Sequence, residues 1–102
     1  MKFYDMLLDI AKRPHLYVGE NNLLMVSHLI GGYTMCANDK GDQVPWQFMH
    51  GFQEYVQERY HEQRTLGWWN IIEMNCPDSE TPTELFGQLI RSYKEERAIG
   101  DC

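Results

Sequence analysis

Along most of this chain, apolar residues recur three and four positions apart, which is the period of an amphipathic α-helix. The first such stretch carries Phe3, Met6, Leu7 and Ile10. This helix ends before Pro14, because proline disfavours helical backbone in the residue that precedes it. Gly19 then allows a turn with positive φ, so we predict a tight extended corner from Arg13 to Gly19.

The stretch from about Asn22 to Ala37 is almost wholly apolar, and Asn21 or Asn22 can cap a helix there. Its larger apolar residues are Leu23, Leu24, Met25, Val26, Leu29, Ile30, Tyr33 and Met35. Because apolar residues surround most of the circumference, we predict a central helix that is buried on several sides.

A third helix is predicted from Pro45, which suits the first helical position, to about Gln63. Its inward side carries Phe48, Phe52, Tyr55, Val56 and Arg59. The opposite side is polar and carries Gln47, His50, Glu54, Gln57, Glu58 and His61. This polar face is the best candidate contact surface of the chain, although the same pattern also fits a helix face that is simply solvated.

Residues 66–74 are too short and too uniformly apolar a run for periodicity to separate helix from strand. We favour a short buried helix, because the segments on both sides are helical. A final helix is marked by Thr81 as its cap, Pro82 at the first position and Glu84 completing a capping box. Its apolar stripe is Leu85, Phe86, Leu89, Ile90 and Tyr93, and Gly100 lies just past its end.

These patterns predict an all-α fold, a compact bundle of about five helices in one domain that spans residues 1–102. A chain of this length can bury enough surface to fold without metal or disulfide support. Apolar residues make up 43% and aromatic residues 13% of the chain, which is enough for a core.

The net charge is −6, and residues 52–102 hold ten acidic residues against five basic ones. An acidic balance argues against binding nucleic acid, whose affinity comes largely from cationic contacts to phosphate. It suits a basic protein partner, which the opposite field would steer into contact. It also suits a protein that charge merely keeps soluble.

Motifs for catalysis or for metal binding are missing from the sequence. The four histidines form no His-x-x-x-His pair, and there is no Gly-x-Ser-x-Gly elbow or phosphate-binding glycine loop. We therefore expect that the chain is not an enzyme and binds no cofactor or metal. A minor enzyme that uses His28 or His61 is the least favoured alternative.

Three cysteines, an odd number without Cys-x-x-Cys spacing, favour reduced thiols in a cytosol. The first residues lack the apolar region of a signal peptide, and no apolar run approaches membrane-spanning length. We expect a cytoplasmic protein with no membrane partner.

Five segments, taken in order, resemble those of a group of small bacterial proteins. They are an Arg-Pro-x-x-Tyr-x-Gly corner, a Leu-rich helix ending in Gly-Tyr, a mid-chain helix that carries Trp and Phe, a Gly-Trp-x-x-Ile-Ile segment and a C-terminal amphipathic helix. Here these segments are Arg13–Gly19, Leu23–Tyr33, Trp46–Arg59, Gly67–Ile72 and Leu85–Tyr93. Some proteins of this kind are immunity proteins of bacterial toxin systems, including contact-dependent growth inhibition. The resemblance implies a cytoplasmic inhibitor that binds a toxin domain.

The charge and the resemblance together predict an immunity protein that neutralises a cognate basic toxin domain, namely a nuclease and in particular an RNase. The predicted contact residues are Asp39, Asp42, Trp46, Glu54, Gln57, Glu58, His61 and Glu62. Trp46 serves as an aromatic anchor in this prediction, and burial in the core is an equally good reading of it. The alternative function is a small-molecule-binding or regulatory helical domain with an aromatic pocket near Trp68, Trp69 and Tyr33.

Overall fold

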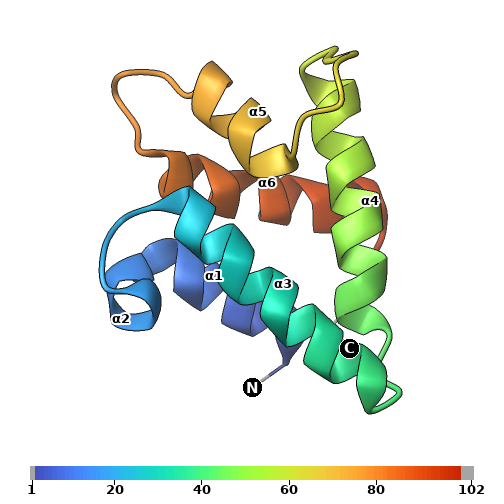
Figure 1. Cartoon of the computed structure of the whole chain (residues 1–102). Helices are drawn as coiled ribbons and strands as arrows, with labels where there is room; N and C mark the ends of the chain where they lie inside the picture. The colour runs from blue at the N-terminus through green and yellow to red at the C-terminus, as the bar shows by residue number, and fades with distance from the viewer. Residues whose placement is uncertain (1, 100–102) are drawn as a thin grey trace.

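The structure is a computed structural model that describes residues 2–99, and these residues form six α-helices and no strand (Figure 1). The helices are α1 (Phe3–Lys12), α2 (Pro14–Val18), α3 (Leu23–Asp39), α4 (Val44–Arg59), α5 (Trp68–Asn75) and α6 (Pro82–Glu96). The predicted all-α class is confirmed, and the helix count is six rather than about five. The short run at residues 66–74 is a helix, as we favoured.

The additional helix is α2, which occupies the segment predicted to be an extended corner. Pro14 takes the first helical position, where its missing N–H group has no intrahelical partner to lose. Arg13 leaves the helical region, with φ −134° and ψ 59°, and so does Gly19 at the other end of α2, with φ +84°. The rule for a residue before proline therefore holds for Arg13, and the positive φ predicted at Gly19 is confirmed. The prediction was wrong for residues 14–18, which are helical and not extended.

A carboxylate of α1 holds this corner in place. Arg13 donates to Asp9 through Nε at 3.0 Å and also through Nη2, and the Tyr17 hydroxyl donates to the other carboxylate oxygen. The hydrogen bond from Tyr17, followed by that from Arg13, lowers the pKa of Asp9 below its ordinary value. The arginine and tyrosine of the Arg-Pro-x-x-Tyr-x-Gly segment thus both join α2 to α1.

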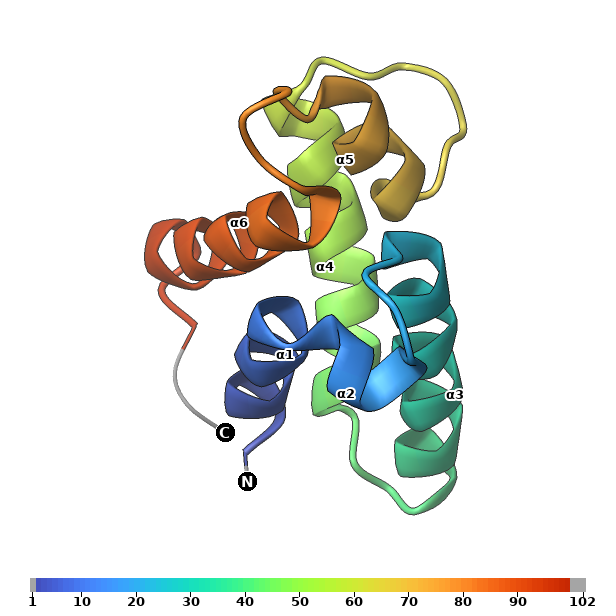
Figure 2. The same cartoon turned by 90° about the vertical axis from the view of Figure 1, so that its left-hand side faces the viewer.

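The core lies where α1 packs against α6 and α3 packs against α4, with α5 closing one end of the molecule (Figure 2). Phe52 of α4 is fully buried at its aromatic centre. Its ring lies 4.9–6.4 Å, centroid to centroid, from those of Phe48, Tyr55, Trp68, Phe86 and Tyr93. The Cα radius of gyration is 13.0 Å.

The helices α3 and α4 each end at a residue other than the predicted one. Asn22 caps α3 by accepting from the Met25 N–H at 3.1 Å, and α3 continues past Ala37 to Asp39. The third predicted helix ends at Arg59 instead of Gln63. The capping box of Thr81 and Glu84 is confirmed, whereas the predicted role of Gly100 lies outside the described residues.

One prediction about α3 was wrong, because a broad face of this helix is exposed. Its buried residues recur at helical spacing on the side that meets the core. The other side presents Met25, Leu29, Tyr33 and Met35 to solvent. The five other helices reach only part of the circumference of α3 (Figure 1), and an apolar composition alone does not tell which sides neighbours cover.

Two glycines that face open space make a matched pair for a stability test. Gly19 ends α2 with φ +84°, and a Cβ there would meet nothing within 4 Å. Gly32 lies inside α3, also with nothing within 4 Å. Gly19→Ala should lower the free energy of unfolding by about 1–2 kcal/mol through left-handed backbone strain. Gly32→Ala should raise it by ~0.5–1 kcal/mol.

Urea denaturation of both variants checks this expectation. Equal changes of one sign would contradict the assignment of the positive φ at Gly19, since neither new methyl group meets another atom.

Candidate functional site

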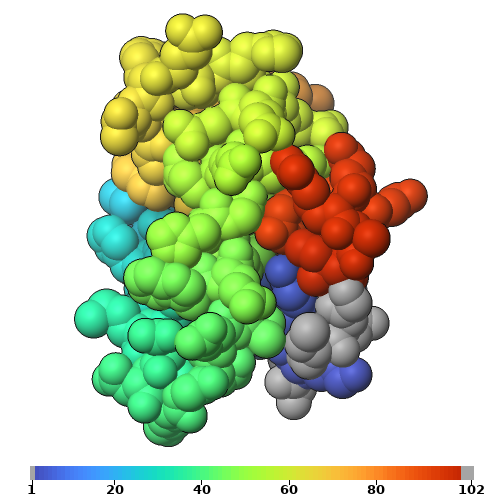
Figure 3. All heavy atoms as spheres, turned by 90° about the vertical axis from the view of Figure 1, so that its right-hand side faces the viewer, coloured from blue at the N-terminus to red at the C-terminus, as the bar shows by residue number. Residues whose placement is uncertain are grey.

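Five of the predicted contact residues line one hollow at the carboxyl end of α4. This acidic hollow has a volume of about 480 Å³. Its lining residues are Glu54, Gln57, Glu58, His61, Glu62 and Gln63. Figure 3 looks onto the outer side of α4, which runs between the α3 side and the α6 side of the molecule. The structure therefore gathers the acidic residues of the predicted polar face at one end of that face.

A turn, and not the helix, brings the last members of this set together. Tyr60 caps α4, and His61 follows in left-handed backbone with φ 52°. The Glu62 N–H then donates to the Gln57 carbonyl at 2.9 Å, so the chain folds back over the last turn of the helix. His61 and Glu62 reach the hollow by this route, although the predicted continuation of the helix was wrong.

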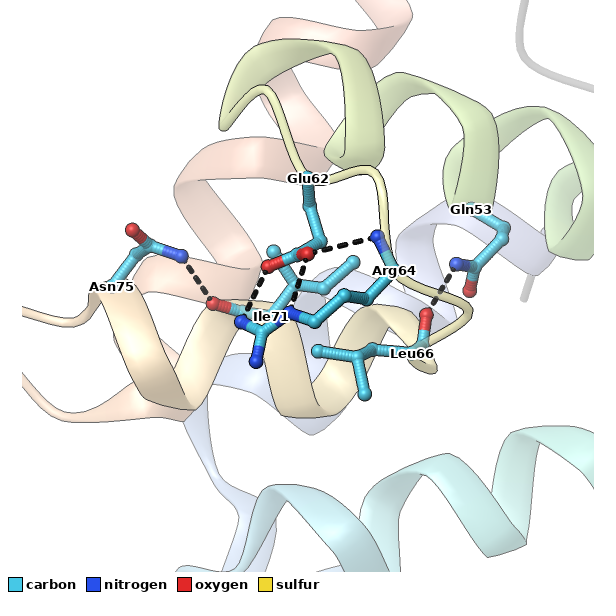
Figure 4. A network of polar contacts seen from close by, with 6 residues as sticks. All are labelled: Gln53, Glu62, Arg64, Leu66, Ile71 and Asn75. Carbon is cyan, nitrogen blue, oxygen red and sulfur yellow. Dashed lines mark hydrogen bonds and ion pairs between the residues drawn. The ribbon is translucent and has the colours of Figure 1, made fainter.

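Two of the three carboxylates in the hollow already have cationic partners. Glu58 accepts from Arg97, which follows α6, at 2.9 Å. Glu62 accepts from the Arg64 side chain at 2.9 and 3.0 Å and from its backbone N–H at 3.0 Å (Figure 4). Within residues 2–99, no hydrogen bond or ion pair involves the Glu54 carboxylate, which makes it the carboxylate of this hollow most available to a partner.

The pKa of Glu62 can be tested directly. The hydrogen bonds from the Arg64 side chain and then from its backbone lower the pKa of Glu62 from 4.5 to about 2. Because this pKa is depressed, the contact stabilises the fold above the ordinary pKa of 4.5 and is lost as the pH falls through about 2. Arg64→Ala removes the side-chain hydrogen bonds and keeps the backbone one, so it should raise the pKa of Glu62 from about 2 toward 4.5, as measured by NMR titration of the carboxyl carbon.

Arg97→Ala is the control for this titration, because it removes the partner of Glu58 and leaves the contacts of Glu62 intact. A pKa of Glu62 that stays near 2 in Arg64→Ala would contradict the role given to Arg64.

The loop between α4 and α5 is fixed to α4 by Gln53. Its amide nitrogen donates to the Leu66 carbonyl at 2.8 Å (Figure 4), and its amide oxygen accepts from the Trp68 N–H at 2.8 Å. One side chain thus holds both the end of the loop, at Leu66, and the start of α5, at Trp68. Asn75 closes the far end of α5 by donating to the Ile71 carbonyl at 2.8 Å.

The remaining predicted residues lie toward the other end of α4. Trp46 is 47% exposed, so the reading of it as a core residue was wrong. Asp39 ends α3, and Asp42 accepts from the Val44 N–H at 3.1 Å. Since α4 is ~24 Å long at 1.5 Å per residue, these two aspartates do not share the acidic hollow.

Trp46 borders a second depression, between α3 and α4, that sequence reasoning missed. This apolar groove has a volume of about 450 Å³. It is lined by Gly31, Thr34, Met35, Trp46, Met49, His50, Gln53 and Trp68. Met35 is 70% exposed, and the Trp46 and His50 rings lie 4.6 Å apart. The i, i+4 spacing of Trp46 and His50 was visible in the sequence, but the exposure of Met35 was not.

The aromatic pocket proposed in the alternative function does not gather its three residues. Trp68 stacks on Phe86 at 4.9 Å in the core, and Tyr33 stacks on Phe3 at 5.9 Å. Trp68 contributes to the apolar groove, whereas Trp69 and Tyr33 are not among the residues that line it.

A roomier hollow of about 620 Å³ lies between α1, α2 and α6, away from every predicted contact residue. Its charged lining residues are of both signs, with Lys12 and Arg91 facing Glu84. Glu84 is already occupied in the capping box of α6. This hollow therefore has neither the single charge sign nor the apolar lining of the two sites on α4.

Within residues 2–99, no three histidine, cysteine or acidic side chains come together as metal ligands would. None of the helices described here is both long and apolar enough to cross a bilayer.

The chain matches no protein-family model, no curated protein and no solved structure. Its functional assignment therefore depends on the surface chemistry of α4 and on the resemblance in short sequence segments.

Proposed function

We propose that this protein is a bacterial immunity protein that binds and neutralises a cognate basic toxin domain in the cytoplasm, and that it is not an enzyme. The observation that supports this proposal best is the acidic hollow, in which Glu54 is a carboxylate without an internal partner. Its toxin is a nuclease, in particular an RNase, of the kind delivered by contact-dependent growth inhibition.

Electrostatics provide the mechanism. A nuclease needs cationic side chains to hold the phosphates of its substrate, since such contacts supply much of the affinity for nucleic acid. An acidic protein that occupies those side chains excludes the substrate. Opposite fields also speed the encounter, and close charge pairs across an interface couple by about 1.5–7 kcal/mol.

The proposed binding surface is the outer side of α4 with its two flanks. The acidic hollow supplies Glu54, Gln57, Glu58, His61 and Glu62, while Trp46, Asp39 and Asp42 contribute from the α3–α4 side. Glu58 and Glu62 would exchange or share their present arginine partners with cations of the toxin. Glu54 needs no such exchange.

Protection of cells is the experiment that tests this function. A nuclease domain encoded beside the gene is expressed from an inducible promoter, with or without the present chain. We expect growth and intact RNA only when both are made, together with a complex that co-elutes in gel filtration. Growth arrest despite abundant folded protein, with no complex formed, would overturn the proposal.

A further inference from the structure

The apolar groove and the acidic hollow lie along one continuous stripe of α4. Trp46, His50, Gln53 and Gln57 follow at i, i+4, i+7 and i+11, which keeps them on the same side of a helix. The first three line the groove, and Gln57 lines the hollow. A single partner that covers this stripe would therefore fill both depressions.

The apolar groove and the acidic hollow suit partner side chains of different kinds. Four apolar side chains dominate the groove, and Trp46 and Met35 stay largely exposed. Its α3 wall cannot form an ion pair, because residues 23–37 contain no aspartate, glutamate, lysine or arginine. The hollow, in contrast, presents carboxylates. Trp46 and Glu54 are ~12 Å apart along the axis, as eight residues rise 1.5 Å each.

We infer, on the basis of the proposed function, that the groove is the docking site of an apolar side chain of the toxin domain. That side chain is flanked, about 12 Å away, by a lysine or arginine that binds Glu54. Trp46 and the methionines clasp the apolar side chain, since methionine adapts its shape to varied partners. The contact between the cation and Glu54 speeds association, and the burial of the apolar side chain in the groove slows dissociation.

The net charge of the chain disfavours a second copy of it as the occupant. Each copy carries a net charge of −6, and a copy that covered the stripe would bring its own carboxylates toward those of the hollow. Like charges placed opposite each other across an interface cost several kcal/mol. The occupant of the stripe is a basic protein surface with an exposed apolar residue.

Synthetic peptides test this inference without the toxin. The probe is a short helical peptide with one leucine and three lysines, the nearest lysine about two turns from the leucine, or ~11 Å at 5.4 Å per turn. Control peptides replace leucine with alanine or the lysines with glutamate. We expect the first peptide to shift the indole N–H resonance of Trp46 and the amide of Glu54 together, and each control to lose at least about tenfold in affinity.

Kinetics with the toxin domain provide the second arm. Trp46→Ala should raise the dissociation rate about tenfold or more, as expected for an anchor residue, and leave the salt dependence of association unchanged. Met74→Ala is the matched control, because Met74 is another exposed apolar residue, on α5. Thermal unfolding confirms that both variants are folded.

The outcomes separate the two proposals. Suppose that the protein neutralises the toxin and that Trp46→Ala dissociates from it at the wild-type rate. That result would overturn the docking inference and leave the proposed function in place. Peptide binding at Trp46 and Glu54 without any cellular protection would overturn the function and leave the docking chemistry in place. Equal shifts from the leucine peptide and from an uncharged alkyl alcohol would make the groove a small-molecule site and overturn the inference.

Discussion

Replacing Glu54 with lysine should lower the affinity of this protein for a basic toxin domain by at least about tenfold. Glu54 is the carboxylate of the acidic hollow without an ion-pair partner of its own, so reversal removes an attraction and adds a repulsion. A close charge pair couples by about 1.5–7 kcal/mol, and each 1.4 kcal/mol is tenfold in affinity. Isothermal titration at several salt concentrations measures both the loss and a shallower dependence on salt.

Asp78→Lys is the control for this reversal, because it changes the net charge by the same amount. Asp78 is exposed in the loop between α5 and α6, which lies on the opposite side of the molecule from the outer face of α4 (Figure 1). Glu58→Lys is a less specific test of the contact surface than Glu54→Lys, since it also breaks the ion pair with Arg97. If Glu54→Lys and Asp78→Lys weaken the complex equally, the α4 face is not the contact surface.

Phe52→Ala should cost about 3–5 kcal/mol of the free energy of unfolding, as truncation of a buried phenylalanine does. Phe52 has no exposed surface and contacts rings from α4, α5 and α6. The new cavity would open between three helices, so no single side chain can move to fill it. Urea denaturation measures the loss, which is a large part of the 5–15 kcal/mol that stabilises an ordinary domain.

Two further variants serve as controls for the stability measurement on Phe52→Ala. Phe52→Leu keeps most of the volume and should cost less than about 1.5 kcal/mol. Leu16→Ala should change stability by less than about 0.5 kcal/mol, because Leu16 is 66% exposed. A loss below about 1 kcal/mol for Phe52→Ala would contradict the central place of this ring.

Local sequence signals predicted the helices of this chain well. The capping box of Thr81 and Glu84 and the cap at Asn22 lie where their side-chain chemistry places them. Such signals act within one turn, so neighbouring helices have little influence on them. The signal at Pro14 was equally local, but proline ends one helix and begins another with the same geometry. In this structure a second helix begins at Pro14, and the contacts of Arg13 and Tyr17 with Asp9 hold it against α1.

Burial was harder to predict than secondary structure. The sequence of α3 is apolar on almost every side, and nothing within it indicates that Met35 faces solvent while Ile30 is fully buried. That difference depends on which helices pack beside α3, which is a property of the whole chain. The apolar groove was missed for the same reason.

The acidic hollow was predicted in part. Helical spacing correctly placed Glu54, Gln57 and Glu58 on one side of α4. His61 and Glu62 joined them through a left-handed turn that the helical pattern did not contain. The arginine partner of Glu58 is Arg97, 39 residues later in the sequence and beyond the reach of any local pattern, whereas Arg64, the partner of Glu62, is only two residues away.

The hydrogen bond between Gln53 and Trp68 makes the exchange rate of one backbone amide sensitive to binding at α4. Gln53 lies between the groove and the hollow on α4, yet it accepts the backbone N–H of Trp68, the first residue of α5. Gln53 and Trp68 both line the apolar groove, so a protein that fills this groove shields their hydrogen bond from water. The rate at which the Trp68 amide exchanges its hydrogen for deuterium therefore reports, from a different helix, whether the α4 surface is occupied.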